Sequence, residues 1–141
     1  EGLRSAPIGL DGKRTVVYER IQALSKEMQP YAAVFMGSKL ISVNHTGVVI
    51  PKGTTQLMKL PDAIKVFDAD EALVSNLENG AYSYFIVVNK NLQHSMPTVI
   101  LTADNVERIA KDGTASPAKN YSSNLEIEPG DMAIFRYPTK K

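Results

Sequence analysis

The chain of 141 residues contains no cysteine and no tryptophan. Without cysteine it can form neither a disulfide bond nor a thiolate nucleophile, and the most recognisable zinc-binding patterns are excluded. Without tryptophan it lacks the exposed indoles on which many carbohydrate-binding modules stack sugar rings.

An excess of one charge sign is also missing, because 16 Lys and Arg residues face 15 Asp and Glu residues and the formal net charge is +1. This balance gives no general reason to expect nucleic acid or an anionic membrane as a partner. No apolar run approaches the roughly 20 residues that a transmembrane helix needs, so we expect no membrane span. The chain begins at Glu1 without a signal peptide, and we interpret it as processed or as a piece of a longer protein.

The composition is ordinary for one soluble globular domain, with 43% hydrophobic and 22% charged residues. Residues 1–12 are rich in Gly, Pro and Ser and are predicted to form a loop or linker, with Asp11 as the N-cap of the helix that follows. A helix at the seam between two domains is predicted over 13–37, because apolar residues recur on one face at spacings of four, three and four. Those residues are Val17, Ile21, Leu24 and Met28.

Pro30 interrupts this helix. It lacks the amide hydrogen that would bond the carbonyl of Lys26, and its ring crowds the preceding turn. We expect a kink there, followed by a second short helical turn in which Phe35 continues the apolar face. Gly37 suits the position just after a helix, which often needs a left-handed backbone.

From residue 38 to residue 141 the pattern changes to short segments separated by turns, which predicts a β-domain. Seven to nine short strands are typical of an antiparallel sandwich or barrel. The predicted fold class is therefore mainly β, an antiparallel Greek-key or jelly-roll-like β-sandwich with one N-terminal kinked α-helix. Strands are expected over 39–45, 47–50, 64–67, 72–77, 81–89, 97–101, 106–110, 125–127 and 132–137, and a long loop over 114–124.

The most clearly marked hairpin covers 72–89 and contains the turn signal Asn79-Gly80. Its second half, 81–89, is apolar on both faces at its centre. This pattern indicates a central strand that is covered on both sides.

Tyr82 and Tyr84 lie two residues apart in that strand, so they share one face of the sheet. An exposed pair could stack on sugar rings. Ile86 and Val88 extend the same face, however, and this favours packing of the tyrosines beneath the N-terminal helix.

Patterns that carry catalysis are weak in this chain. Its two histidines, His45 and His94, lie far apart and in no metal-ligand spacing, so local hydrogen bonds and solvent are the expected surroundings of each. The carboxylates at turns form no evident acid–base pair, and the acidic bend at Asp68, Asp70 and Glu71 lacks the spacing of a calcium loop. We therefore predict no catalytic residue, no metal site and no cofactor.

A resemblance to a known family adds to this interpretation. In the segment 9–28 an Asp-Gly turn precedes a helix of the form Tyr-Glu-x-Ile-x-x-Leu-x-x-Glu. This segment resembles the last helix of (β/α)8-barrel glycoside hydrolases, particularly the bacterial β-galactosidase-like enzymes. The segments 84–89 and 125–135 are similar to strands of the β-sandwich that follows such barrels, and Gln29-Pro30-Tyr31 and His45 fit the same pattern.

The resemblance implies a non-catalytic C-terminal accessory domain of a secreted glycoside hydrolase, located in the periplasm or outside the cell. The catalytic carboxylates of that family lie on barrel strands, so no catalytic residue is carried over to this chain. The implied partner is the catalytic barrel of the same polypeptide. The helix face would pack against that barrel, or partly against the sandwich, through Val17, Ile21, Leu24, Met28 and Phe35.

The sequence leaves two alternative functions open. One is a carbohydrate-binding module that contacts polysaccharide through Tyr82, Tyr84, His45 and Asn44. The other is a small free-standing jelly-roll enzyme, which would need clustered histidines or carboxylates.

Overall fold

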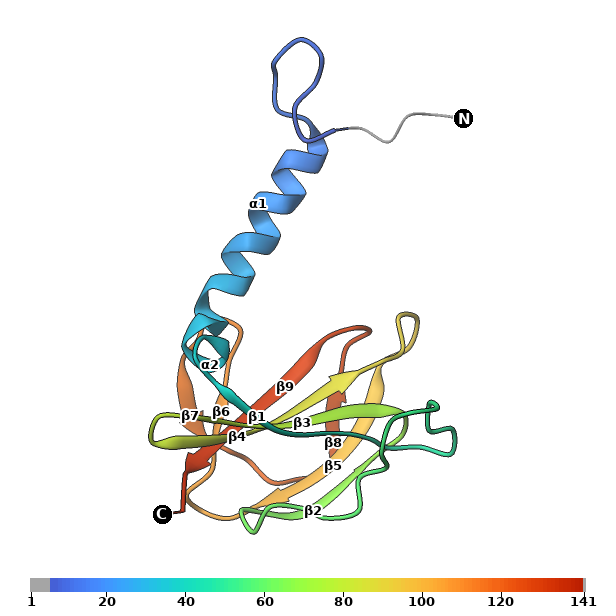
Figure 1. Cartoon of the computed structure of the whole chain (residues 1–141), viewed down its shortest axis with the longest axis vertical. Coiled ribbons are helices and arrows are strands. Elements are labelled where there is room, and N and C mark those ends of the chain that lie inside the picture. The colour runs from blue at the N-terminus through green and yellow to red at the C-terminus, as the bar shows by residue number, and fades with distance from the viewer. Residues whose placement is uncertain (1–5, 141) are drawn as a thin grey trace.

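The computed structural model describes residues 6–140, apart from the side chains of 122–124. Within this range nine strands form two antiparallel sheets, of six strands in the order β1-β3-β4-β9-β6-β7 and three in the order β2-β5-β8. The two sheets face each other as a β-sandwich (Figure 1), which confirms the predicted fold class. The strands are β1 (Lys39–His45), β2 (Ile64–Ala69), β3 (Ala72–Asn79), β4 (Tyr82–Asn89), β5 (Met96–Thr102), β6 (Glu107–Ile109), β7 (Ala115–Pro117), β8 (Tyr121–Ile127) and β9 (Met132–Pro138).

A long helix projects away from the sandwich (Figure 1). Helix α1 (Val16–Met28) leads into a 3-10 turn η1 (Gln29–Tyr31) and a short helix α2 (Ala32–Phe35). The predicted break at Pro30 is therefore confirmed. Gly37 follows with a φ of 74°, a left-handed conformation that costs little without a Cβ atom.

The N-cap of α1 is Thr15, whose side chain accepts from the amide of Val17, so the prediction of Asp11 is wrong. The Asp11 carboxylate instead accepts from the amide of Lys13, at 3.1 Å. The amide of Gly9 also donates to the carbonyl of Lys13, at 2.8 Å. These bonds close a small loop ahead of the helix, and that loop delays the first helical turn.

Two strand predictions are corrected. Residues 47–50 form no strand, because Thr46 is bonded to Ala72 through both its amide and its hydroxyl and the chain then turns at Gly47, where φ is 97°. Conversely, the predicted loop 114–124 contains β7 and the start of β8. β7 lies at the exposed edge of the large sheet, and its three small exposed residues (Ala, Ser and Pro) carry no alternating apolar signal.

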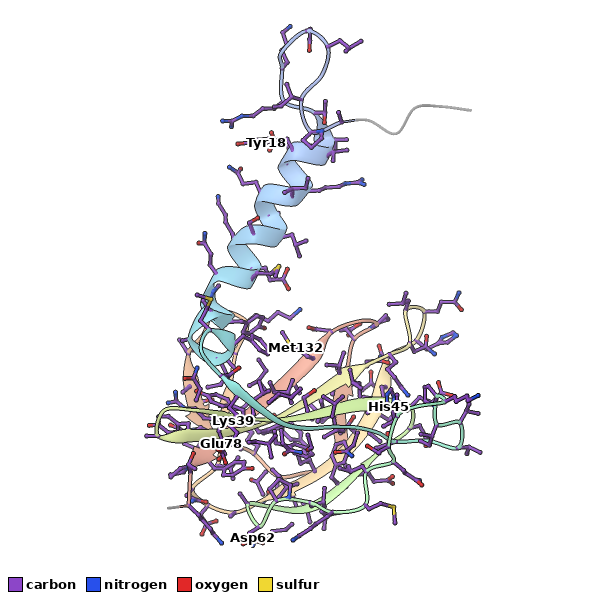
Figure 2. The ribbon with its side chains drawn as sticks, viewed as in Figure 1. Tyr18, Lys39, His45, Asp62, Glu78 and Met132 are labelled. Atoms are coloured by element: carbon purple, nitrogen blue, oxygen red, sulfur yellow. The ribbon has the colours of Figure 1, made fainter. Side chains whose placement is uncertain are left out.

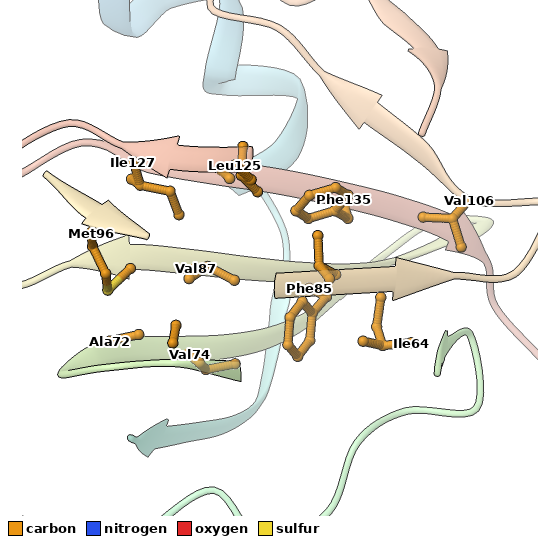
Figure 3. Close-up of a cluster of buried hydrophobic side chains, with 13 residues drawn as sticks. Ile64, Ala72, Val74, Phe85, Val87, Met96, Val106, Leu125, Ile127 and Phe135 are labelled. Carbon is orange, nitrogen blue, oxygen red and sulfur yellow. The ribbon is translucent and has the colours of Figure 1, made fainter. Parts of the chain in front are cut away.

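The main core lies between the two sheets and is shown in Figure 3. Phe85 and Val87 of β4 point into it, beside Phe135 of β9. The alternate residues of β4 lie on the outer face of the six-stranded sheet, where Tyr84 and Ile86 are also buried. β4 is therefore covered on both sides, as its two-sided apolar pattern predicts.

A second buried cluster covers the outer face of the six-stranded sheet. Tyr31 of η1 and Val34 of α2 pack there against the sheet, while α1 contributes no residue to the cluster. The short helical segment thus packs on the outer face of this sheet, whereas the long helix does not. The sheet residues beneath it are Leu77, Tyr84, Ile86, Ile109 and Ile134.

Asn79 ties this short helix to the sheet. Its side-chain nitrogen lies 3.1 Å from the carbonyl oxygen of Ala33, 3.1 Å from that of Val34 and 3.0 Å from that of Met36. The hairpin turn falls one residue later than its sequence signal, with Gly80 at a φ of 60°. Asn79 therefore acts as a cap for carbonyls that the end of α2 leaves free.

Replacing Asn79 with Ala should lower the free energy of unfolding by about 1–2 kcal/mol, because it leaves partly buried carbonyls without a donor. Urea denaturation followed by far-UV circular dichroism measures this loss. The exposed Asn105→Ala is the matched control and should change stability by less than about 0.5 kcal/mol. Equal midpoints for the two variants would show that the cap contributes nothing.

Candidate functional site

The most unusual surface of the molecule is the apolar face of α1. All residues of this helix are described, and none of them is buried. The side chain of Ile21 is 50% exposed, that of Leu24 56% and that of Met28 60%, and Phe35 beyond the kink is 41% exposed. Val17 is partly covered. Figure 2 shows the side chains of α1 standing clear of the sandwich, so this face does not pack against it.

Two contacts join the base of α1 to the sandwich. Lys111, in the turn between β6 and β7, lies 2.7 Å from the carboxylate of Asp131 and 3.5 Å from that of Glu27 in the last turn of α1. The hydrogen bond to Asp131 is the main cause that raises the pKa of Lys111, so the amine stays charged. Gly113 of the same turn sits so close to Pro30 that a Cβ atom there would lie 3.1 Å from the proline ring.

The two candidate tyrosines do share the outer face of β4, since Tyr82 pairs with Asn79 and Tyr84 with Leu77. Tyr84 is only 5% exposed and packs beneath η1 and α2. This agrees with the packing interpretation, except that the short helical segment covers the ring instead of α1. Tyr82 has the guanidinium of Arg136 4.4 Å from its ring centre. Neither tyrosine offers a pair of open ring faces.

His45 and Asn44 lie elsewhere. His45 occupies the far end of the outer face, in one row with Leu73 and Val88, and its Nδ1 is 3.2 Å from the ammonium of Lys90. Val88 is six residues from Tyr82 along β4, which corresponds to about 20 Å. The structure therefore does not bring His45 together with the tyrosines.

Asn44 points to the opposite face, because side chains alternate along β1. Its side-chain amide donates to the hydroxyl of Thr55 at 3.0 Å. Asn44 also lines a hollow of about 430 Å³ between β1, β3 and the segment 56–61. A second hollow of about 360 Å³ continues from it, since Glu78, Ser83 and Tyr137 line both.

This groove contains residues that the sequence analysis did not single out. Asn76 and Glu78 of β3 lie on the inner face of the six-stranded sheet, in line with the core residue Val74. Tyr137 reaches the groove from β9, and burial is the main cause that raises the pKa of its phenol. The carboxylates of Glu78 and Asp62 raise that pKa further, so the hydroxyl stays neutral near pH 7. The sequence does carry a signal for this groove: Asn76 and Glu78 are polar residues at alternate positions of β3, where the inner face of a sandwich strand is usually apolar.

Other candidate groups stay apart. Among the described residues, no group of three or more His, Cys, Asp or Glu residues could hold a metal ion. Glu71 of the acidic bend has a left-handed backbone with a φ of 54°. His94 is exposed in the 90–95 loop, where its backbone amide donates to the side chain of Asn91 and its carbonyl accepts from Asn89.

No family model, curated protein or solved structure matches this chain. The β-sandwich is thus established by the structure itself, and the role of the chain is inferred from its surfaces. In the part of the chain that the structure describes, no helix is both long and apolar enough to cross a bilayer.

Proposed function

We propose that this chain is a non-catalytic C-terminal accessory domain of a glycoside hydrolase, and that α1 packs against a catalytic barrel of the same polypeptide. The observation that carries the proposal is the bare apolar face of α1. The resemblance of segment 9–28 to the last helix of such barrels supports it. As part of the same proposal, the parent protein acts in the periplasm or outside the cell.

The energetics of α1 support an absent partner. A helix of 13 residues is marginal in water when no tertiary contact supports it. Each large apolar side chain gains about 1.5–3 kcal/mol on full burial, and Ile21, Leu24 and Met28 are all at least half exposed. The sandwich already has two buried clusters to which α1 does not contribute. The apolar face therefore has no role within this domain, and a neighbouring surface would explain it.

Leu24 gives the test of this packing. In the parent polypeptide, Leu24→Asp should weaken the contact between the two domains by about 2–5 kcal/mol, because it places a carboxylate in an apolar interface. We expect a single calorimetric transition of the parent to split into two. In the isolated chain the same change should leave the melting temperature of the sandwich nearly unaltered, since Leu24 is 56% exposed.

Gln22→Asp is the matched control, because Gln22 is exposed and lies off the apolar face of the same helix. The proposal fails if the two variants of the parent unfold alike. It also fails if the isolated chain sediments as a stable dimer that Leu24→Asp dissociates, since a second copy would then be the partner of α1.

A further inference from the structure

We propose that the groove between β1, β3 and the segment 56–61 binds a neutral sugar. It opens on the inner face of the six-stranded sheet, whereas η1 and α2 pack on part of the outer face. Its volume of about 430 Å³ falls in the range of small-molecule sites.

The polar floor of the groove is the first argument. Inner-facing residues of a sandwich normally fill the core, as Val74 and Phe85 do here. At the next positions towards the sheet end, the inner face instead carries residues with polar groups on three neighbouring strands. These residues are Glu78, Ser83 and Tyr137, which are paired in register.

Asn76 provides the second argument. Its side-chain nitrogen donates to the hydroxyl of Ser42 at 3.0 Å. Its side-chain oxygen is buried and has no hydrogen-bond partner among the described residues. A buried acceptor without a donor costs about 1–3 kcal/mol. A small shift of this amide towards the groove that Asn76 lines would let a ligand hydroxyl supply the missing donor.

The chemistry of the lining selects the class of ligand. Amides of Asn44, Asn76 and Gln56 both donate and accept, which suits the hydroxyl groups of a sugar. Glu78 can accept from two neighbouring hydroxyls. Met58 and Leu60 form an apolar wall on which the C–H face of a sugar ring can rest.

Titration of the 15N-labelled chain with methyl glycosides of glucose, galactose, mannose, xylose and arabinose tests this site. We expect saturable amide shifts confined to residues near 42–44, 56–61, 76–78, 83 and 137, with a dissociation constant of about 1 mM or tighter for at least one glycoside. Glycerol, a small polyol without a ring, should produce no comparable shifts.

Asn76→Leu should weaken that binding about tenfold or more, because it removes the amide that lines the groove together with its unpaired oxygen. Asn76 is partly buried, so Gln56→Ala serves as a second variant with an exposed side chain and should also weaken binding. The exposed Gln93→Ala is the control, and thermal melts verify that each variant is folded. The site is refuted if no glycoside gives saturable shifts, if glycerol shifts the same amides equally, or if Asn76→Leu and Gln56→Ala bind as the control does.

Discussion

Replacing Asn89 with Asp should destabilise the sandwich by about 3–5 kcal/mol at pH 7, because it buries a charge without a partner. Asn89 is 1% exposed. Its side-chain nitrogen donates to the carbonyl oxygens of His94 and Ile127, each at 2.9 Å, and to that of Glu128 at 3.2 Å. Its side-chain oxygen accepts from the amide of Asn91 at 2.9 Å. The side-chain amide of Asn89 thus joins the end of β4, the following loop and the end of β8. In the Asp variant a carboxylate oxygen would replace the amide nitrogen and would face these carbonyl oxygens without a hydrogen to donate.

The destabilisation should depend on pH with a definite sign. Burial beside carbonyl oxygens raises the pKa of the introduced carboxyl above its unfolded value of about 3.9. The penalty relative to the natural chain is therefore smallest below about pH 4, where both states are protonated, and grows as the pH rises.

Urea denaturation of both proteins at several pH values between 3.5 and 7, roughly the span over which a carboxyl titrates, measures this dependence. The exposed Asn105→Asp should show no comparable trend. A difference in unfolding free energy that stays constant with pH would argue against a buried carboxyl at position 89.

Phe85→Ala should cost about 3–5 kcal/mol of unfolding free energy, because it opens a cavity in the main core. The ring is fully buried and meets that of Phe67 edge to face, with the centroids 5.2 Å apart. This contact joins β4 of the large sheet to β2 of the small one, so its loss should loosen the packing of the two sheets.

Phe35→Ala is the control with the same chemical change, since Phe35 is 41% exposed on the segment that continues the helix face. In the isolated chain it should cost less than about 1 kcal/mol. Chemical denaturation of the two variants compares these values directly. A loss for Phe35→Ala as large as that for Phe85→Ala would place Phe35 in the domain core and would remove it from the proposed interface.

The two proposed surfaces differ in chemistry and lie in separate places. The bare face of α1 is apolar and suits a permanent neighbour, whereas the groove carries amides, hydroxyls and a carboxylate. Binding of a sugar in the groove therefore would not require displacement of a docked barrel. If both proposals hold, the domain binds a neighbouring domain through α1 and a sugar through the groove.

Much of the fold followed from local patterns in the sequence. The alternation over 39–45 predicts β1 with its observed bounds, and the two-sided apolar run of β4 predicts a central strand. Pro30 predicts the break after α1. Its missing amide hydrogen removes a helix hydrogen bond regardless of what the helix packs against.

The sequence-based predictions fail where a contact with a residue distant in the sequence overrides the local pattern. Thr46 is held by Ala72, which ends β1 and prevents a strand over 47–50. β7 pairs with β6 and forms the edge of the large sheet, so its three residues are a strand only because of this pairing. Asn79 was expected to belong to the turn, yet it caps carbonyls of α2 that only the folded chain brings near.

The same division applies to the candidate sites. The apolar stripe of α1 can be read from the sequence, because its spacing follows from the helix repeat. The exposure of this stripe and the burial of Tyr84 depend on how the elements pack. The same packing brings Asn44, Asn76 and Tyr137 into one groove. Side chains from separate strands converge through sheet register and through the packing of one sheet on another, and neither is encoded in the pattern of a single segment.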